Sequence, residues 1–170
     1  MSDVTTMRRT GWSSAAAQLI TAWAILGGFV LLLVVAMNVA SVIGGIVWKP
    51  FPGDFEMTQV GVAVAVFAFL PYCQINDTNV TADIFTQRAP ARTVLWLKLI
   101  TAMIALGFAV LLLWRMFGGL QNQRDYGYTT TILQFPIWTA FVPILVSLAL
   151  LALAALVSLS DNAQALKEIP

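Results

Sequence analysis

Histidine is missing from this chain, and cysteine occurs once, at Cys73. The lack of histidine removes the usual haem ligand, the usual imidazole ligand for metal ions and the usual general base. A single cysteine cannot form a disulfide within the chain, so it gives no indication of the redox compartment. The composition therefore argues against a redox or metal-dependent centre built from this chain alone, and no cofactor is expected.

Charged residues are also scarce. They make up 10% of the 170 residues, whereas hydrophobic residues make up 59% and the mean hydropathy is +0.84. A soluble domain is usually about one-quarter charged, and one small core cannot bury this much apolar surface, so we expect lipid to be the solvent. The net charge of +1 gives no electrostatic basis for binding nucleic acid.

Four long apolar runs account for this composition. A helix needs about 20 mostly apolar residues to cross a bilayer, and an open sheet edge cannot lie in lipid with unpaired backbone groups. The sequence therefore predicts an all-α integral membrane protein that forms a single membrane domain over residues 1–170. Its four transmembrane helices are expected at about 19–43, 57–75, 94–114 and 137–159.

The first apolar run continues beyond its predicted span, as far as Trp48. As one helix it would be roughly 45 Å long, so it could tilt, or bend at Gly44–Gly45 and leave a short interfacial helix after the first span. The segment "PFPGDFE" then breaks the chain. Gly53 or Asp54 is expected to cap the second helix, which places Glu56 in its first turn, where a carboxylate suits the helix dipole.

Lysine and arginine indicate the orientation, because cytoplasmic connections carry an excess of them. Six lie on the side of the termini and of the connection 76–93, and three lie on the other side. Both termini are therefore expected in the cytoplasm. The six are Arg8, Arg9, Arg88, Arg92, Lys98 and Lys167, and the three are Lys49, Arg115 and Arg124.

The middles of all four predicted spans lack charged residues. Ion-coupled transporters and proton pumps place ionisable groups within the membrane, where charge is costly and is kept for function. Lys98 and Arg115 lie near opposite ends of the third span and are expected to anchor its boundaries. Because neither a transport site nor a redox site can be assembled from this chain, the sequence favours an accessory subunit.

Small residues recur at helical spacing on the first two spans. Such faces let membrane helices approach closely. They would serve either packing within this four-helix unit or a contact with another subunit. The two sets are Ala36, Ala40 and Gly44 on the first span, and Gly61, Ala65 and Ala68 on the second.

The connection between the second and third spans, "INDTNVTADIFTQR", is rich in hydrogen-bonding groups. Solvated connections often have this composition without a special function. Asn79 and Asp83 could form hydrogen bonds there, and Asp83 could cap a short helix or pair with Arg88. We interpret the segment as a polar hinge at the cytoplasmic surface that directs the second helix towards the third and contacts a partner.

Several of these segments resemble the DctQ-like small membrane subunit of tripartite ATP-independent periplasmic (TRAP) transporters. A glutamate opens the second helix in that family, as Glu56 does in "PGDFE". A Gly-containing outer loop resembles "WRMFGGLQNQRDYGYTT", and a Pro and a Trp lead into the fourth span, as in "LQFPIWTAFVPI". The resemblance covers about residues 19–160 and implies four spans with both termini inside.

One segment departs from the family pattern. After the second helix the family carries a His-Ile-Arg-Val-Asp-like segment, and "NVTAD" occupies that place here. Asn79 stands where His is usual, and Thr81 stands where Arg is usual, while Asp83 is retained. A charged contact made by this segment in other members would therefore be a neutral hydrogen bond here.

The resemblance also implies partners and a localisation in the bacterial inner membrane. A large TRAP membrane subunit would carry the substrate and sodium sites and move them in an elevator motion. A periplasmic binding protein would deliver a carboxylate or another small organic acid, and the small subunit would brace the large one without enzymatic activity. Subunit or structural contacts are expected at Glu56, Asn79, Asp83 and Arg88, and docking contacts with the binding protein at Lys49, Asp54, Arg124 and Asp125.

Two other functions stay open at the level of the residues. A membrane anchor subunit of a redox or other enzyme complex would call for cofactor ligands, which this chain hardly offers. A small transporter that works on its own would call for ionisable groups in mid-membrane. The substrate cannot be read from the sequence, because the residues that select it would lie in other chains.

Overall fold

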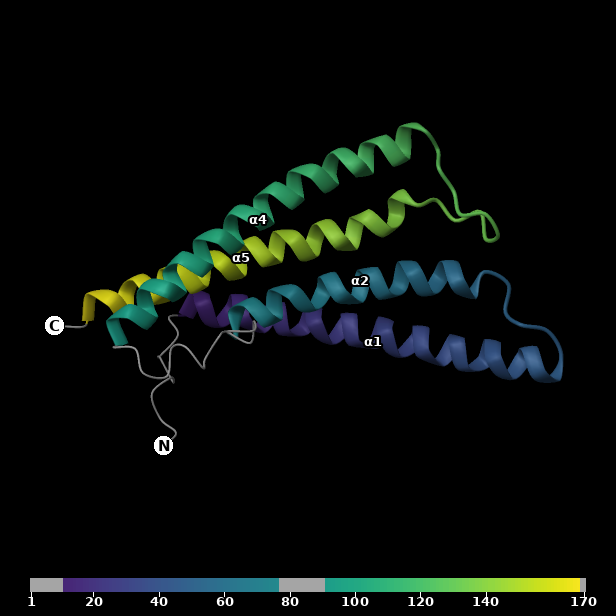
Figure 1. Ribbon diagram of the computed structural model, residues 1–170, viewed down its shortest axis with the longest axis horizontal. Coiled ribbons are helices and arrows are strands. Elements are labelled where there is room, and N and C mark those ends of the chain that lie inside the picture. The colour runs from purple at the N-terminus through teal and green to yellow at the C-terminus, as the bar shows by residue number, and fades with distance from the viewer. Residues whose placement is uncertain (1–10, 77–90, 169–170) are drawn as a thin grey trace.

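The computed structural model describes residues 11–76 and 91–168 (Figure 1). This part of the chain forms four helices, and each is long and apolar enough to cross a membrane. The prediction of an all-helical protein with four candidate spans is therefore confirmed. The helices are α1 (Gly11–Val47), α2 (Asp54–Ile75), α4 (Ala91–Asp125) and α5 (Trp138–Glu168).

All four helices are longer than the spans that hydropathy indicated, and three of them are longer by two turns or more. α1 has 37 residues, α4 has 35 and α5 has 31. A helix of 35 residues is roughly 50 Å long, against roughly 30 Å for the hydrocarbon core of a bilayer. Polar ends such as "LQNQRD" and "SDNAQALKE" extend the helices because they contain no Pro or Gly to interrupt the backbone hydrogen bonds.

The chain between α1 and α2 differs from one of the alternatives drawn from the sequence. α1 continues through Gly44–Gly45 to Val47, and the Trp48 N–H donates to the Gly44 carbonyl at 2.7 Å. Residues 48–53, all of them described, form no interfacial helix. Gly53 is the N-cap of α2, as expected, and its left-handed backbone (φ 78°) suits a residue without a Cβ.

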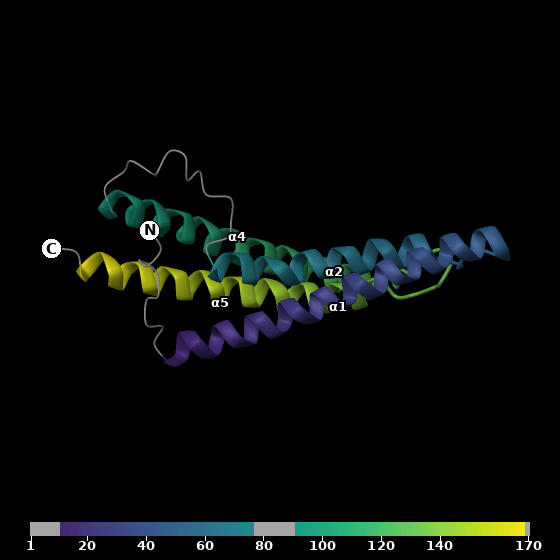
Figure 2. The same ribbon diagram turned by 90° about the horizontal axis from the view of Figure 1, so that it is seen from below.

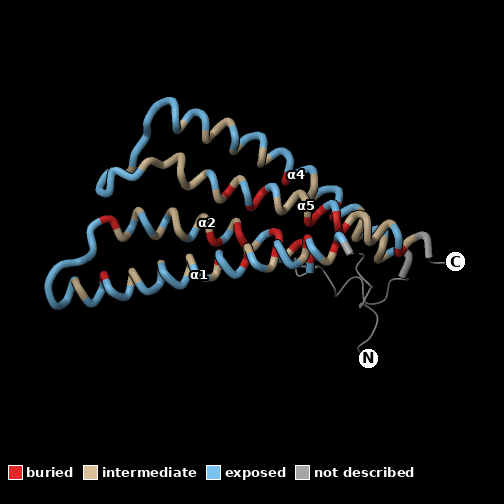
Figure 3. Tube along the Cα trace, turned by 180° about the vertical axis from the view of Figure 1, so that it is seen from behind, coloured by how far each residue is buried: buried red, intermediate tan, exposed pale blue. Residues whose placement is uncertain are grey.

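α2 lies between α1 and α5, and α4 packs against α5 (Figures 1 and 2). The start of α1, the end of α2, the start of α4 and the end of α5 lie at one end of the bundle, here called the terminal end. The connections 48–53 and 126–137 lie at the other end, here called the open end. Towards the open end the α1/α2 pair and the α4/α5 pair move apart (Figures 1 and 3).

The buried core lies mostly in the half of the bundle near the terminal end (Figure 3). Ala16, Ile20, Ile75, Ala154 and Val157 form one cluster of buried side chains there. Two of the five are alanines, whose small side chains let the helices approach closely in a medium that offers little hydrophobic driving force. The core therefore holds α1, α2 and α5 together at the terminal end.

A polar contact in mid-bundle also joins α1 to α5. The Trp23 indole N–H donates to the Ser147 hydroxyl at 2.9 Å, and that hydroxyl donates to the Pro143 carbonyl at 2.8 Å. In lipid an unsatisfied polar group is costly, so a paired indole is the favourable arrangement. α5 continues through Pro143 as one helix.

The two sets of small residues have different surroundings. Ala65 and Ala68 on α2 are buried against α1, where Gly27 makes room for Ala68. Ala36 and Ala40 on α1 are exposed. The second set therefore serves packing within the unit. In the first set, Ala36 and Ala40 face away from the other described helices, and Gly44 lies beside the Lys49 carbonyl.

Candidate functional site

Glu56 joins the start of α2 to the connection between α4 and α5. Its Oε1 accepts a hydrogen bond from the Ile132 N–H at 2.8 Å, and its Oε2 accepts one from the Leu133 N–H at 3.1 Å. Both oxygens of one carboxylate therefore bind successive backbone N–H groups, and hydrogen bonds to a charged acceptor are stronger than those between neutral groups. Sequence reasoning selected Glu56, and the structure places its carboxylate in a contact within the chain.

The connection 126–137 is ordered by its own hydrogen bonds, and it is here called the hairpin. Thr129 and Pro136 form an isolated antiparallel bridge. The Thr130 N–H donates to the Phe135 carbonyl at 2.9 Å, and the Phe135 N–H donates to the Thr130 hydroxyl at 3.1 Å. The hairpin tip therefore presents the backbone N–H groups of Ile132 and Leu133 to α2.

Asp54 is part of a network between α1 and α2. Its Oδ2 accepts a hydrogen bond from the Ser41 hydroxyl at 2.5 Å, and its Oδ1 accepts one from the Phe55 N–H at 2.7 Å. The Ser41 hydroxyl oxygen also accepts the Phe51 N–H at 3.1 Å, which holds the 48–53 connection against α1. The network gives the Asp54 carboxylate a positioning role between α1 and α2, and its contact with the binding protein stays a prediction.

A second polar contact lies one turn further along the same two helices. The Asn38 side-chain amide donates to the Thr58 hydroxyl at 2.8 Å, and that hydroxyl donates to the Asp54 carbonyl at 2.7 Å. Together with Ser41, these groups join α1 to α2 near the open end. They complement the apolar packing that joins the same helices near the terminal end.

The other predicted docking residues lie at the open end with exposed side chains. Lys49 belongs to the 48–53 connection, and Arg124 and Asp125 end α4. A basic residue such as Arg124 in a last turn suits the helix dipole. The structure brings none of these three into the Glu56 contact. Asn79, Asp83 and Arg88 lie outside the described residues, so their role in a polar hinge stays a prediction.

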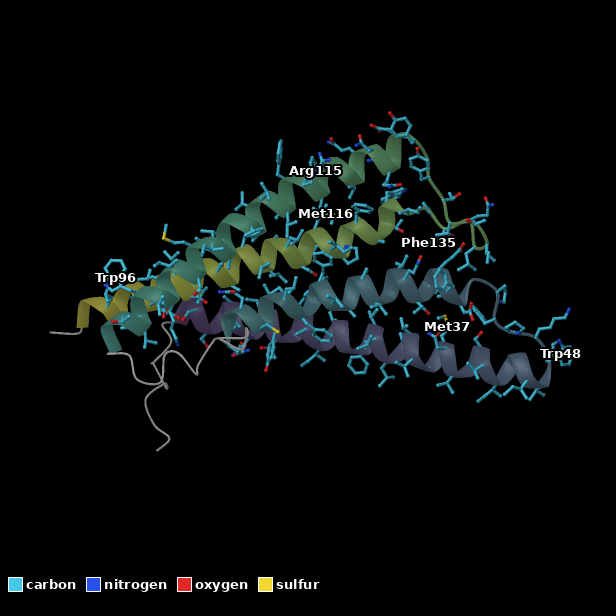
Figure 4. All side chains as sticks on the ribbon, in the orientation of Figure 1. Met37, Trp48, Trp96, Arg115, Met116 and Phe135 are labelled. Atoms are coloured by element: carbon cyan, nitrogen blue, oxygen red, sulfur yellow. The ribbon has the colours of Figure 1, made fainter. Side chains whose placement is uncertain are left out.

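An apolar groove of about 680 Å³ opens beside Glu56. It is lined by Val34 and Met37 from α1, by Val60 from α2, and by Leu133 and Phe135 from the hairpin. Figure 4 shows Met37 on α1 and Phe135 in the hairpin, both near the start of α2. Sequence reasoning missed this groove and the hairpin contact. The available signal was the apolar pair Ile132–Leu133, followed by Phe135, in the connection between the third and fourth spans.

The described residues offer no obvious metal site. Within residues 11–76 and 91–168, no three His, Cys, Asp or Glu side chains gather where they could hold a metal ion. What the open end does present is a set of structural contacts around Glu56 and Asp54 and a rim of exposed charges.

The comparison with known families agrees with this arrangement. The family model for the DctQ component of tripartite ATP-independent periplasmic transporters matches residues 32–165. The chain belongs to this family. The matched range includes α2, α4, the hairpin, most of α5 and the part of α1 from residue 32 onward. No curated protein and no solved structure gives a match to the chain.

Membership of the DctQ family confirms the resemblance drawn from the sequence. It makes this chain a small membrane component of a TRAP transporter and supports that interpretation over an enzyme anchor. The four membrane-spanning candidates agree with a multi-pass membrane protein.

Proposed function

We propose that this DctQ component is the scaffold subunit of a sodium-coupled TRAP transporter that imports a small organic acid across the bacterial inner membrane. It braces the large membrane subunit, which carries the substrate and sodium sites, and it contributes to docking of the periplasmic binding protein. Both termini face the cytoplasm, so the open end faces the periplasm. The family match over residues 32–165 is the observation that carries the proposal.

The surface of α4 supports a partner within the membrane. α4 packs mainly against α5, and it carries large apolar side chains that are exposed around much of its circumference. Lipid or the large subunit would cover such a surface. Examples are Trp96 (53% exposed), Met103, Phe108 and Trp114 (74% exposed).

Purification of the tagged chain from its native membranes in mild detergent tests the proposal. We expect a much larger, very hydrophobic membrane protein to co-purify in stoichiometric amount, identified by mass spectrometry, with untagged membranes as the control. Adding the binding protein to the reconstituted complex should then give sodium-dependent uptake of an organic acid. A chain that emerged alone, or with a cofactor-bearing enzyme, would contradict the proposal and support the anchor function.

The exposed charges of the open end give a second prediction. Reversing Lys49 and Arg124 together (Lys49→Glu, Arg124→Glu) should change the association rate of the binding protein by roughly tenfold at low salt. Charges at the rim of an interface act chiefly on the encounter rate, and salt screens them over about 10 Å at 0.1 M. Binding kinetics measured over a series of salt concentrations should therefore show the effect fading.

Asp54→Asn is the matched control for this measurement. Its carboxylate is engaged with Ser41 and the Phe55 N–H, so this variant should lower the stability of the subunit and leave the salt dependence of docking unchanged. Equal association rates for the native and charge-reversed chains at low salt would show that Lys49 and Arg124 do not belong to the docking surface.

A further inference from the structure

Little buried core joins the two helix pairs at the open end of the bundle. The α1/α2 pair and the α4/α5 pair move apart there (Figure 1), whereas the buried core that joins them lies towards the terminal end. A scaffold subunit needs a defined outer surface, and two diverging helix pairs would bend relative to each other. Something that crosses between the pairs at the open end would restrain that motion.

We propose that Glu56 is a latch that fastens the hairpin across the open end, so that the hairpin acts as a strap between the two helix pairs. The hairpin connects α4 to α5 through the backbone, and Glu56 belongs to α2. The bonds from its two carboxylate oxygens to the Ile132 and Leu133 N–H groups, at 2.8 and 3.1 Å, join residues 76 and 77 positions apart in the chain. The latch therefore connects the second helix pair to the first.

Apolar contacts seat the strap beside the latch. Leu133 lies directly over Gly53, where an added Cβ would come within 2.5 Å of the Leu133 Cγ. Leu133 and Phe135 also line the groove with Val34 and Met37 of α1. The strap thus forms one wall of the groove, and the Glu56 bonds hold that wall against α1 and α2.

Hydrogen bonds within the strap tie its tip to the ends of α4 and α5. The Thr129–Pro136 bridge and the Thr130–Phe135 hydrogen bonds hold its two sides together. The Ile137 N–H also donates to the Tyr128 carbonyl at 3.1 Å, immediately before α5 begins. A displacement of the tip therefore moves the ends of α4 and α5, and releasing Glu56 would allow the pairs to separate and the groove to widen.

Pulsed electron paramagnetic resonance tests the latch. Spin labels would be placed at Ile43 on α1 and Phe117 on α4, both exposed, in a chain whose single cysteine is replaced (Cys73→Ser). We expect one narrow distance distribution in the native chain and a broader distribution, shifted to longer distances, in Glu56→Ala. Glu56→Gln keeps one acceptor oxygen and should give an intermediate distribution, and it serves as the main variant if Glu56→Ala does not fold.

Hydrogen exchange gives a second, independent measurement. The amides of Ile132 and Leu133 should exchange roughly tenfold faster in Glu56→Ala than in the native chain, because the hairpin tip opens locally. Asp125→Asn is the matched control, since it removes an exposed carboxylate from the same end of the molecule and should change neither measurement. If Glu56→Ala leaves both the distances and the exchange unchanged, or if Asp125→Asn changes them equally, there is no latch.

The latch does not depend on the proposed transport function. Both measurements are made on the chain as it purifies, with its partner or alone. Failure to find a large subunit would therefore contradict the scaffold role and leave the latch standing. Unchanged distances in an intact complex would contradict the latch and leave the scaffold role standing.

Discussion

Gly27→Leu should separate α1 from α2 and strongly destabilise the subunit, whereas Gly28→Leu, one residue away, should leave it nearly unchanged. A Cβ at Gly27 would lie 2.6 Å from the Ala68 Cβ and 3.5 Å from the Ala65 carbonyl oxygen, whereas a Cβ at Gly28 would meet nothing within 4 Å. Overpacking a well-packed core usually costs about 1–3 kcal/mol. We expect Gly27→Leu to lower the free energy of unfolding by about 3 kcal/mol, the upper end of this range, because even the first added carbon has no room.

Thermal unfolding of the purified chain in detergent, followed by tryptophan fluorescence, measures this difference. The two variants add the same side chain at neighbouring positions of the same helix, so helix propensity and added hydrophobicity are matched. Ala68 should also matter, because Ala68→Leu fills the same space from the α2 side. Equal unfolding temperatures for Gly27→Leu and Gly28→Leu would show that α1 and α2 do not pack through Gly27.

Gly53→Ala should destabilise the open end for two separable reasons. Gly53 has φ 78°, and a left-handed conformation costs an L-residue with a Cβ about 1–2 kcal/mol. The new Cβ would also lie 2.5 Å from the Leu133 Cγ and 2.8 Å from its Cδ1, so the hairpin would have to move away from α2. We therefore expect lower thermal stability and faster amide exchange across the hairpin.

Gly127→Ala separates the two causes. Gly127 has φ 61° and no neighbouring atom within 4 Å of its added Cβ, so its substitution carries the conformational cost without the collision. Gly53→Ala should therefore lower the thermal stability more than Gly127→Ala does. In a Leu133→Ala background, the loss of thermal stability caused by Gly53→Ala should fall towards the loss caused by Gly127→Ala. Two variants of equal stability would show that Leu133 does not rest on Gly53.

The number and type of the helices could be predicted from the sequence, because lipid leaves the backbone few alternatives. A long apolar run must satisfy its own backbone hydrogen bonds, and a helix does this within one segment. The ends of the helices were less predictable. Hydropathy reports which residues lie in lipid, whereas a helix ends where the backbone is interrupted, as at Gly127 (φ 61°) after α4.

The candidate site was predictable only in part. Glu56 and Asp54 could be selected because carboxylates at the start of a helix are favourable. Their partners could not be selected, since the Ile132 and Leu133 N–H groups lie 76 and 77 residues from Glu56 and carry no side-chain signature. Asp54 was predicted to contact the binding protein because it would face the periplasm, and nothing in the sequence indicated that its carboxylate accepts a hydrogen bond from Ser41 between α1 and α2.

The sequence by itself determined that this chain consists of four apolar helices without charged groups in mid-span, and its motifs already indicated the DctQ family. These properties are local, because each follows from a run of residues and its solvent. Only the tertiary structure decided that Ala65 and Ala68 face α1 while Ala36 and Ala40 face outward, and that Glu56 holds the hairpin. Such contacts depend on how distant segments are brought together, which the spacing of residues along one helix does not specify.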